Sequence, residues 1–240
     1  MRSAIINPQP VSEFVQVEVQ AGRIIGPLQD LPQVHVSRFR VIPKQGQPGK
    51  RRLILDLSSP HNHSVNDSIA SNLCSIKYAT VDNAVQKILQ LHRNSLLAKI
   101  DIKHAYRNIP IHPSDHKLLG MSWNGALYID TALPFGLRSA PKIFSAVSDT
   151  LEWIALHEGI SILLHYLDDF LTMGRELTSE CWDNLQRPVH LCQRLGLPLK
   201  WQKLEGPATV LGFLGILLDT QRMEMHLPQK KTEGTQAADQ

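Results

Sequence analysis

Two adjacent aspartates, Asp168 and Asp169, lie between two short apolar runs, and this arrangement limits what the chain can fold into. Residues 161–166 and 170–173 are apolar enough to be buried strands, so the pattern predicts a hairpin with the acidic pair at its turn. Two charges at the tip of a buried hairpin destabilise the fold unless something binds them. An Asp-Asp pair taken alone indicates only a turn, because aspartate suits turns.

A third carboxylate extends this pattern. Residues 96–101 form a short apolar run that ends in Asp101, which predicts a buried strand with the acid at its end. If this strand and the hairpin share one sheet, three carboxylates converge at one edge and raise one another's pKa values unless a cation neutralises them. Hard oxygen ligands suit Mg²⁺, which takes substrate phosphates as further ligands. Two such ions about 4 Å apart promote phosphoryl transfer.

Apolar periodicity and turn residues predict helices and strands in alternation along the chain. We expect helices at 10–22 (with Ser12 as N-cap and Gly22 as stop), 80–92, 140–157 and 179–195. Besides those above, we expect strands at 39–42 and 52–57 (a hairpin), a strand or hairpin at 123–129, and strands at 210–219, with residues 58–79 as loop. This order predicts an α+β fold whose antiparallel sheet has helices packed on one face.

Composition narrows the class of protein. A length of 240 residues predicts one large or two small domains, and a net charge of +3 is too small to prove a polyanionic partner. Three cysteines without a CxxC pair argue against a disulfide framework. No apolar run is long enough for a membrane span or a signal peptide, so we expect an intracellular chain, cytoplasmic or nuclear, with no membrane partner.

The acidic hairpin resembles the YxDD box of reverse transcriptases, and five further segments resemble motifs of that family in the family's order. The six segments are 48–56 (fingers), 101–110 (first palm motif), 133–144 (LPFGLxxAPxxF), 166–169, 196–203 (lysine-bearing) and 213–215 (primer grip). The resemblance covers roughly residues 35 to 220. The motif sequences LILDLSSP, LPFGLRSAPKIF and LHYLDDFL most resemble those of DIRS-like, tyrosine-recombinase retrotransposons, with gypsy-like elements next.

The resemblance implies the fingers and palm of a right-handed polymerase. The implied division is 1–34 (N-terminal helix and lead-in), 35–95 (fingers with the basic hairpin), 96–227 (palm) and 228–240 (polar disordered tail). We expect the thumb to be absent or rudimentary, because few residues follow the primer grip at Phe213, Leu214 and Gly215. Other polyprotein segments, such as RNase H and a recombinase, are expected partners that this sequence does not contain.

The implied activity is RNA-directed DNA polymerisation, in which dNTPs are added to a primer paired with an RNA or DNA template. By the resemblance, two Mg²⁺ ions, with Mn²⁺ as a substitute, are held by Asp101, the Ile102 carbonyl and Asp168, with Asp169 in support. Lys203 is the implied general acid for the departing pyrophosphate. The alternative for Lys203 is a solvated lysine.

The resemblance also implies a nucleotide pocket. Lys50 and Arg52 would clamp the β- and γ-phosphates, although a solvated basic loop is an equal alternative from that segment alone. Tyr106 would stack beneath the sugar and exclude a 2′-hydroxyl, unless it is an ordinary core tyrosine. Phe135 and Gly136 would shape the pocket, with Gly136 allowing backbone to approach the substrate closely.

Three interpretations of the whole chain stay open. The first is a polymerase domain, which the intact acids favour. The second is a truncated or captured copy that only binds nucleic acid, favoured by the missing thumb and by Arg51, which stands where we expect tryptophan. The third is an unrelated α+β binding module, which requires six ordered matches to be coincidence.

Overall fold

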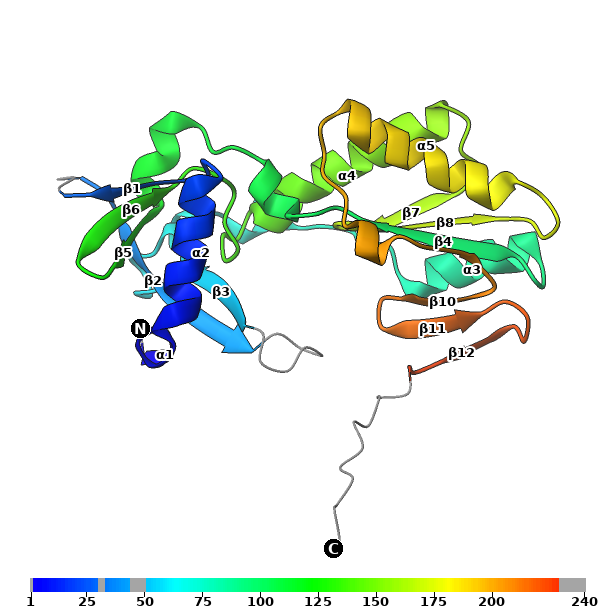
Figure 1. The fold of residues 1–240 in the computed structure, drawn as a ribbon, viewed down its shortest axis with the longest axis horizontal. Helices are drawn as coiled ribbons and strands as arrows, with labels where there is room; N and C mark the ends of the chain where they lie inside the picture. Colours follow the sequence, from blue (N-terminus) through cyan, green and yellow to red (C-terminus); the bar gives the residue numbers. More distant parts are fainter. Residues whose placement is uncertain (1, 30–32, 44–50, 229–240) are drawn as a thin grey trace, which may run out of the picture. The chain divides into compact units, whose positions relative to one another are not determined.

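The computed structural model describes residues 2–29, 33–43 and 51–228, in two compact units that are each discontinuous in sequence (Figure 1). The first unit comprises residues 1–77 and 104–148, and the second comprises 78–103 and 149–240. The predicted fingers (35–95) and palm (96–227) are each continuous in sequence. This division stays a prediction. Of the predicted tail at 228–240, all but residue 228 lies outside the described residues.

The first unit is built on a mixed sheet with the strand order β1-β6-β5-β2-β3 among the described residues. Its strands are β1 (Ile24–Leu28), β2 (Val36–Pro43), β3 (Arg51–Asp56), β5 (Gly120–Trp123) and β6 (Ala126–Asp130). Strands β2 and β3 are antiparallel, with Phe39 opposite Leu55, so the predicted hairpin at 39–57 is confirmed. Strand β5 runs parallel to β2 and forms a second hairpin with β6.

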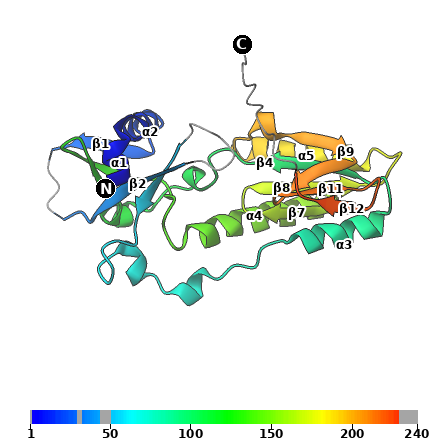
Figure 2. The ribbon, with the colours of Figure 1, turned by 90° about the horizontal axis from the view of Figure 1, so that it is seen from below.

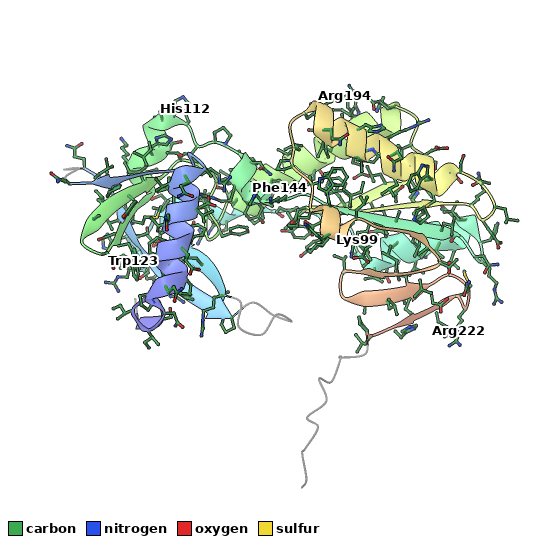
Figure 3. All side chains as sticks on the ribbon, in the orientation of Figure 1. Lys99, His112, Trp123, Phe144, Arg194 and Arg222 are labelled. Atoms are coloured by element: carbon green, nitrogen blue, oxygen red, sulfur yellow. The ribbon has the colours of Figure 1, made fainter. Side chains whose placement is uncertain are left out.

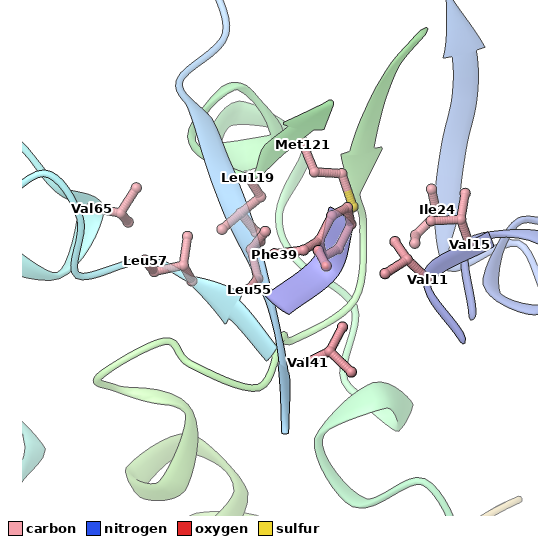
Figure 4. Packing of buried hydrophobic residues seen from close by; sticks show 11 residues of the cluster. Val11, Val15, Ile24, Phe39, Val41, Leu55, Leu57, Val65, Leu119 and Met121 are labelled. Carbon is pink, nitrogen blue, oxygen red and sulfur yellow. The ribbon is translucent and has the colours of Figure 1, made fainter. Parts of the chain in front are cut away.

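Helices α1 (Arg2–Ile6) and α2 (Pro8–Gln20) pack on this unit (Figure 1). Figure 4 shows the apolar side of α2, Val11 and Val15, in one cluster with side chains of the sheet. The predicted N-cap is wrong: α2 begins one turn earlier, and Ser12 instead accepts a hydrogen bond from Trp123 Nε1 at 2.9 Å. Proline suits the first turn, because an N–H there has no partner within the helix.

A buried ion network connects α2 to the sheet. Arg107 lies in a 3₁₀ turn, Ala105–Asn108, and its side chain is 4% exposed. Its guanidinium contacts Glu18 of α2 at 2.8 Å and Asp130 of β6 at 2.6 Å, and Glu18 also pairs with Arg23 at 2.8 Å. Burial raises the pKa of Asp130 to about 6 despite the adjacent Arg107. Burial also acts on Glu18, but Arg23 and Arg107 outweigh it and lower the pKa of that carboxyl.

The second unit is built on an antiparallel sheet, as predicted, with the order β7-β8-β4-β9 among the described residues. Its strands are β4 (Leu96–Asp101), β7 (Leu163–Tyr166), β8 (Asp169–Gly174) and β9 (Glu205–Ala208). A smaller sheet contains β10 (Val210–Phe213), β11 (Ile216–Asp219) and β12 (Glu224–His226). The predicted strand at 96–101 and the predicted acidic hairpin are therefore confirmed.

The second unit has helices on both faces of its sheet, so the prediction of helices on one face is wrong. Helix α5 (Glu180–Arg194) covers the face of Phe170 and Gly174, where a Cβ on Gly174 would come within 2.1 Å of the Cys181 nitrogen. Helix α3 (Val81–Leu91) and the smaller sheet cover the face of Leu97 and Leu171 (Figures 1 and 2). Strand β8 is buried on both sides, so each of its faces packs against other elements.

Local capping signals explain where the helices of this unit begin and end. Helix α3 follows Thr80, whose hydroxyl accepts from Asn83 N at 3.2 Å, while Asn83 Oδ1 accepts from Thr80 N at 2.9 Å. Helix α5 ends before Gly196, which has a φ of +70°. Helix α4 (Ala140–His157), whose residues 140–148 belong to the first unit, has the bounds that the sequence predicted. Within the described residues, no helix has the length and apolarity that crossing a membrane requires.

Candidate active site

Asp101, Asp168 and Asp169 lie together at one end of the four-stranded sheet. Asp101 is the last residue of β4 and stands opposite Asp169, the first residue of β8. The Ile102 nitrogen donates to the Asp168 carbonyl at 3.0 Å, which fixes the hairpin turn beside the end of β4. The predicted convergence of the three acids is confirmed. Asp101 is 2% exposed, whereas the side chain of Asp168 is 31% exposed.

The acidic turn has a strained backbone. Tyr166 pairs with Asp169, which leaves Leu167 and Asp168 as the two turn residues. Leu167 has a φ of +53°, a left-handed conformation that costs a residue with a side chain about 1–2 kcal/mol. The flanking strand pairs hold this conformation, and strain of this kind is concentrated at functional sites.

His165 anchors the same hairpin to helix α4. Its Nε2 atom lies 3.0 Å from Asp149 Oδ1 and 3.3 Å from Glu152 Oε2. Burial lowers the pKa of His165 although Asp149 opposes the shift, and burial together with Asp149 raises the pKa of Glu152. We did not predict this anchor, because the helix and the strand are separate in sequence.

Two lysine ammonium groups bind the buried carboxylate of Asp101. Lys200 Nζ donates to Oδ1 of Asp101 and also to Oδ2 of Asp168, the latter at 3.3 Å. Lys203 Nζ donates to Oδ2 of Asp101. The sequence predicted Lys203 at this site but missed Lys200, which makes contact with two of the three acids.

Backbone pairing explains the position of Lys200. Residue Leu199 bridges to Ile102 in antiparallel register, and the Lys200 nitrogen donates to the Asp101 carbonyl at 2.9 Å. The segment before the lysine-bearing turn is therefore fastened along the end of β4. No sequence signal identifies this pairing, because it joins residues about a hundred positions apart.

Lys99, labelled in Figure 3, is a third lysine on the same strand face as Asp101. Its ammonium group lies 3.1 Å from a carboxylate oxygen of Glu205 on β9 and 3.4 Å from the Gly212 carbonyl. Lys99 therefore forms its ion pair with Glu205 on the neighbouring strand and not with the acidic cluster.

The site carries an excess of negative charge. Burial raises the pKa of Asp101, but hydrogen bonds from Lys200 and Lys203 outweigh it and hold that pKa below its usual value. The pKa of Asp169 is raised to about 6 by burial and by the neighbouring Asp101 and Asp168. The hydrogen bond to Asp101 raises the pKa of Lys203. The electrostatics favour the entry of further positive charge.

The donor chemistry of the three acids fits Mg²⁺, because carboxylate oxygens are the hard ligands that this ion prefers. Among the residues that the structure describes, however, no three His, Cys, Asp or Glu side chains are placed to hold a metal ion. Both Asp101 oxygens are instead bound by lysines. A metal ion at Asp101 would have to share these oxygens with the two ammonium groups or displace them.

The first unit contains the residues predicted for a nucleotide pocket. Tyr106 is 9% exposed, and its ring centroid lies 5.0 Å from that of Phe135 and 5.5 Å from that of Phe144, which is labelled in Figure 3. Phe135 is half-buried. Lys50 lies outside the described residues, and nothing is described of the Arg52 side chain. The roles of these residues and of Gly136 in a nucleotide pocket stay predictions.

Gly136 is packed against the backbone of strand β3. Its φ is +112°, and a Cβ there would come within 2.1 Å of the Leu55 carbonyl oxygen. The Gly136 carbonyl accepts from Asn66 Nδ2 at 2.8 Å, and Asn66 Oδ1 accepts from Arg138 N at 2.7 Å. The sequence missed Asn66, which is 3% exposed and lies in the segment predicted as loop.

The predicted primer grip forms a tight turn between β10 and β11. Phe213 pairs with Ile216, and Leu214 and Gly215 have φ values of +50° and +80°. Phe213 is 1% exposed and belongs to the hydrophobic core of the second unit. The turn residues, and not the Phe213 side chain, are therefore the part available to a ligand.

Residues 42–218 match the family described as "Reverse transcriptase (RNA-dependent DNA polymerase)". The chain belongs to this family. Among its curated relatives are the retrovirus-related Pol polyprotein from transposon opus of Drosophila melanogaster, at 22% identity, and the Gag-Pro-Pol polyprotein of Mason-Pfizer monkey virus, at 25%. These matches cover 88% and 84% of this reverse transcriptase-family chain, which spans only 20% and 11% of the two relatives.

Solved structures show the same fold. A foamy viral protease-reverse transcriptase in complex with double-stranded DNA has a TM-score of 0.72 at 20% identity, covering 92% of this chain and 35% of that chain. A second structure, in complex with an RNA/DNA hybrid, has a TM-score of 0.70 at 18% identity, covering 92% and 27%. The α+β fold of the chain therefore matches the fingers and palm region of these proteins.

Proposed function

We propose that this chain is the RNA-directed DNA polymerase domain of a retroelement polyprotein, which adds dNTPs to a primer 3′-hydroxyl. The observation that carries the proposal is the register of the sheet, which brings Asp101, Asp168 and Asp169 together inside a family match of residues 42–218. Two features support it further. The relatives are Pol polyproteins, and similar structures hold double-stranded DNA or an RNA/DNA hybrid.

The proposal assigns two Mg²⁺ ions, with Mn²⁺ as a substitute, to the acidic cluster. Asp101, Asp168 and the Ile102 carbonyl would hold them, with Asp169 in support. Bound Mg²⁺ supplies the positive charge that phosphoryl transfer from a triphosphate requires. Lys203 is protonated beside Asp101 and is proposed to give its proton to the departing pyrophosphate. Primer, template and dNTPs are oriented by the rest of the chain, including the turn at Leu214 and Gly215.

Primer extension tests this function. We expect the wild-type chain to extend a labelled primer on an RNA template with dNTPs and Mg²⁺. In Asp168→Asn, extension should fall by at least about a thousandfold, because the carboxylate that would hold the metal is lost while the shape is kept. The assay measures the initial rate of dNTP incorporation in both proteins.

The control is Asp183→Asn on α5, an exposed carboxylate that accepts from Ser179 and lies outside the cluster. It should extend primers at the wild-type rate. Equal extension by wild type and Asp168→Asn would show that the acidic cluster is not the site of chemistry. No extension by folded wild-type protein would contradict the polymerase proposal for this chain.

Tyr106 is proposed to select deoxyribonucleotides. An aromatic side chain held between Phe135 and Phe144 would leave no room for a 2′-hydroxyl on a sugar stacked above it. We expect Tyr106→Ala to raise the ratio of ribonucleotide to deoxyribonucleotide incorporation about tenfold to a hundredfold. Single-nucleotide incorporation with rNTP and dNTP measures this ratio. Tyr106→Phe keeps the ring and should keep the wild-type ratio, and an unchanged ratio in Tyr106→Ala would contradict the role.

One observation favours the second candidate, a captured copy that binds nucleic acid without polymerising. Both Asp101 oxygens are bound by lysines, and within the described part of the chain no three ligand side chains are placed for a metal. A protein of this kind would retard primer–template in gel-shift assays yet fail to extend it. The same extension assay therefore separates the two candidates.

We propose that the chain comes from a DIRS-like element, with a gypsy-like element as the second choice. The proposal rests on the amino-acid sequences of its motifs alone. Such an origin places the chain inside the cell, in the cytoplasm or the nucleus, with further polyprotein segments as partners. The sequence that flanks its gene tests this. A tyrosine-recombinase gene beside it supports the DIRS-like origin, whereas a retroviral-type integrase segment contradicts it.

A further inference from the structure

Lys200 binds the carboxylate oxygens that the proposed function assigns to metal ions. Its ammonium group donates to Asp101 Oδ1 and, at 3.3 Å, to Asp168 Oδ2. Asp101 ends strand β4 and Asp168 lies in the turn between β7 and β8, and Lys200 joins them from a third segment. One cationic side chain thus occupies a position between both proposed metal ligands.

The backbone holds Lys200 in this position. Its nitrogen donates to the Asp101 carbonyl at 2.9 Å, and the bridge between Leu199 and Ile102 fastens the preceding residue. The Lys200 side chain is 31% exposed, so its ammonium group can turn outward to water without unfolding the segment. Rotation of the side chain alone would therefore release the contact.

The balance of charge at the acidic cluster bears on how a divalent ion would bind. Three carboxylates face the two ammonium groups of Lys200 and Lys203. A divalent ion held by Asp101 and Asp168 would compete for the oxygens that Lys200 binds, and its charge would repel the Lys200 ammonium group. Lys200 would then be available to pair with another anion, and an incoming triphosphate is an anion of that kind.

We infer that Lys200 is a built-in counter-ion that competes with metal for Asp101 and Asp168, and that an incoming triphosphate relieves this competition. The inference rests on the proposed function for the identity of the metal site. Its consequence is that metal binding is weak without a nucleotide and strengthens with one. Lys203 contacts Asp101 alone and is 51% exposed, so it competes less.

Metal titration of the full chain tests the inference without any turnover. Mn²⁺ is added to metal-stripped protein, and free Mn²⁺ is measured by its electron paramagnetic resonance signal. We expect Lys200→Gln, which keeps a hydrogen-bond donor but no charge, to bind Mn²⁺ at least about tenfold more tightly than wild type. Lys200→Arg keeps the charge and should stay within about twofold of wild type. Lys203→Gln should show a smaller gain than Lys200→Gln.

The same titration with a non-hydrolysable dNTP analogue tests the second half of the inference. We expect the analogue to tighten Mn²⁺ binding in wild type more than in Lys200→Gln, so that the difference between the two proteins shrinks. Asp168→Asn should weaken Mn²⁺ binding in every background. Thermal unfolding checks that each variant is folded.

Wild-type protein offers a second measurement in case Lys200→Gln does not fold. The ¹⁵N resonance of the Lys200 ammonium group reports its ion pair, and Mg²⁺ should shift it to the position of a solvated lysine. An unshifted resonance, or equal Mn²⁺ affinity of wild type and Lys200→Gln, overturns the inference, as does absence of Mn²⁺ binding in all variants. The primer-extension assay tests the proposed function separately. If wild type extends primers but Lys200→Gln and wild type bind Mn²⁺ equally, only the role of Lys200 is overturned.

Discussion

Replacement of Arg107 by methionine is expected to destabilise the first unit by about 3–5 kcal/mol. The guanidinium is 4% exposed and pairs with Glu18 and Asp130, so its removal leaves buried carboxylates with fewer partners. Glu18 keeps its contact with Arg23, whereas Asp130 keeps only the hydrogen bond from Ala132 N and, within the described residues, loses its one ion pair. The free energy of unfolding, measured by urea titration at pH 7, checks this value.

The loss in Arg107→Met should also depend on pH. Burial already raises the pKa of Asp130 to about 6, above the ordinary 3.8, and loss of Arg107 raises it further. A carboxyl with a raised folded-state pKa stabilises the fold below its unfolded pKa, and that stability is lost as the pH rises through the folded pKa. The variant should therefore differ more from wild type at pH 8 than at pH 5. Adding Asp130→Asn should reduce this dependence.

Arg40→Met is the matched control. Arg40 pairs with Asp56 at 2.8 Å, but its side chain is 64% exposed, so its loss should cost less than about 1 kcal/mol. Equal urea midpoints for the two arginine variants would show that the buried network does not hold α2 on the sheet. Glu18 lies before residues 42–218, which match the family. A large loss in Arg107→Met would therefore show that the folded domain includes helix α2.

The parts of the fold that the sequence predicted correctly depend on neighbouring residues. The hairpin at Asp168 follows from two apolar runs on either side of a turn, and α3 begins at the capping residue Thr80. The placement of Asp101 beside that hairpin followed from its position at the end of a buried strand. Each of these signals is contained within a few positions of the chain.

The parts that the sequence did not predict depend on contacts between distant residues. Glu18 and Arg107 are 89 positions apart, and Lys200 and Asp101 are 99 apart, so no local pattern marks either pair. The same holds for Asn66, which reaches the Gly136 carbonyl across 70 positions. Helices on both faces of the second sheet were missed because the order of elements does not determine the face on which each packs.

Gly136→Ala is expected to destabilise the first unit by at least about 3 kcal/mol. The new Cβ would lie 2.1 Å from the Leu55 carbonyl oxygen, which belongs to the backbone of β3 and cannot rotate away. The backbone φ of +112° adds strain for any residue with a side chain. Relief of the clash would move the loop from β3 and break the hydrogen bond from Asn66 to the Gly136 carbonyl.

Gly125→Ala separates the clash from the backbone strain. Gly125 has a φ of +76° in the turn between β5 and β6, and a Cβ there meets nothing within 4 Å. Its replacement should cost only the left-handed penalty, about 1–2 kcal/mol. Urea unfolding of both variants measures the difference. Equal losses would mean that β3 moves aside without cost, and that the close approach at Gly136 does not fix the loop on which the proposed nucleotide pocket depends.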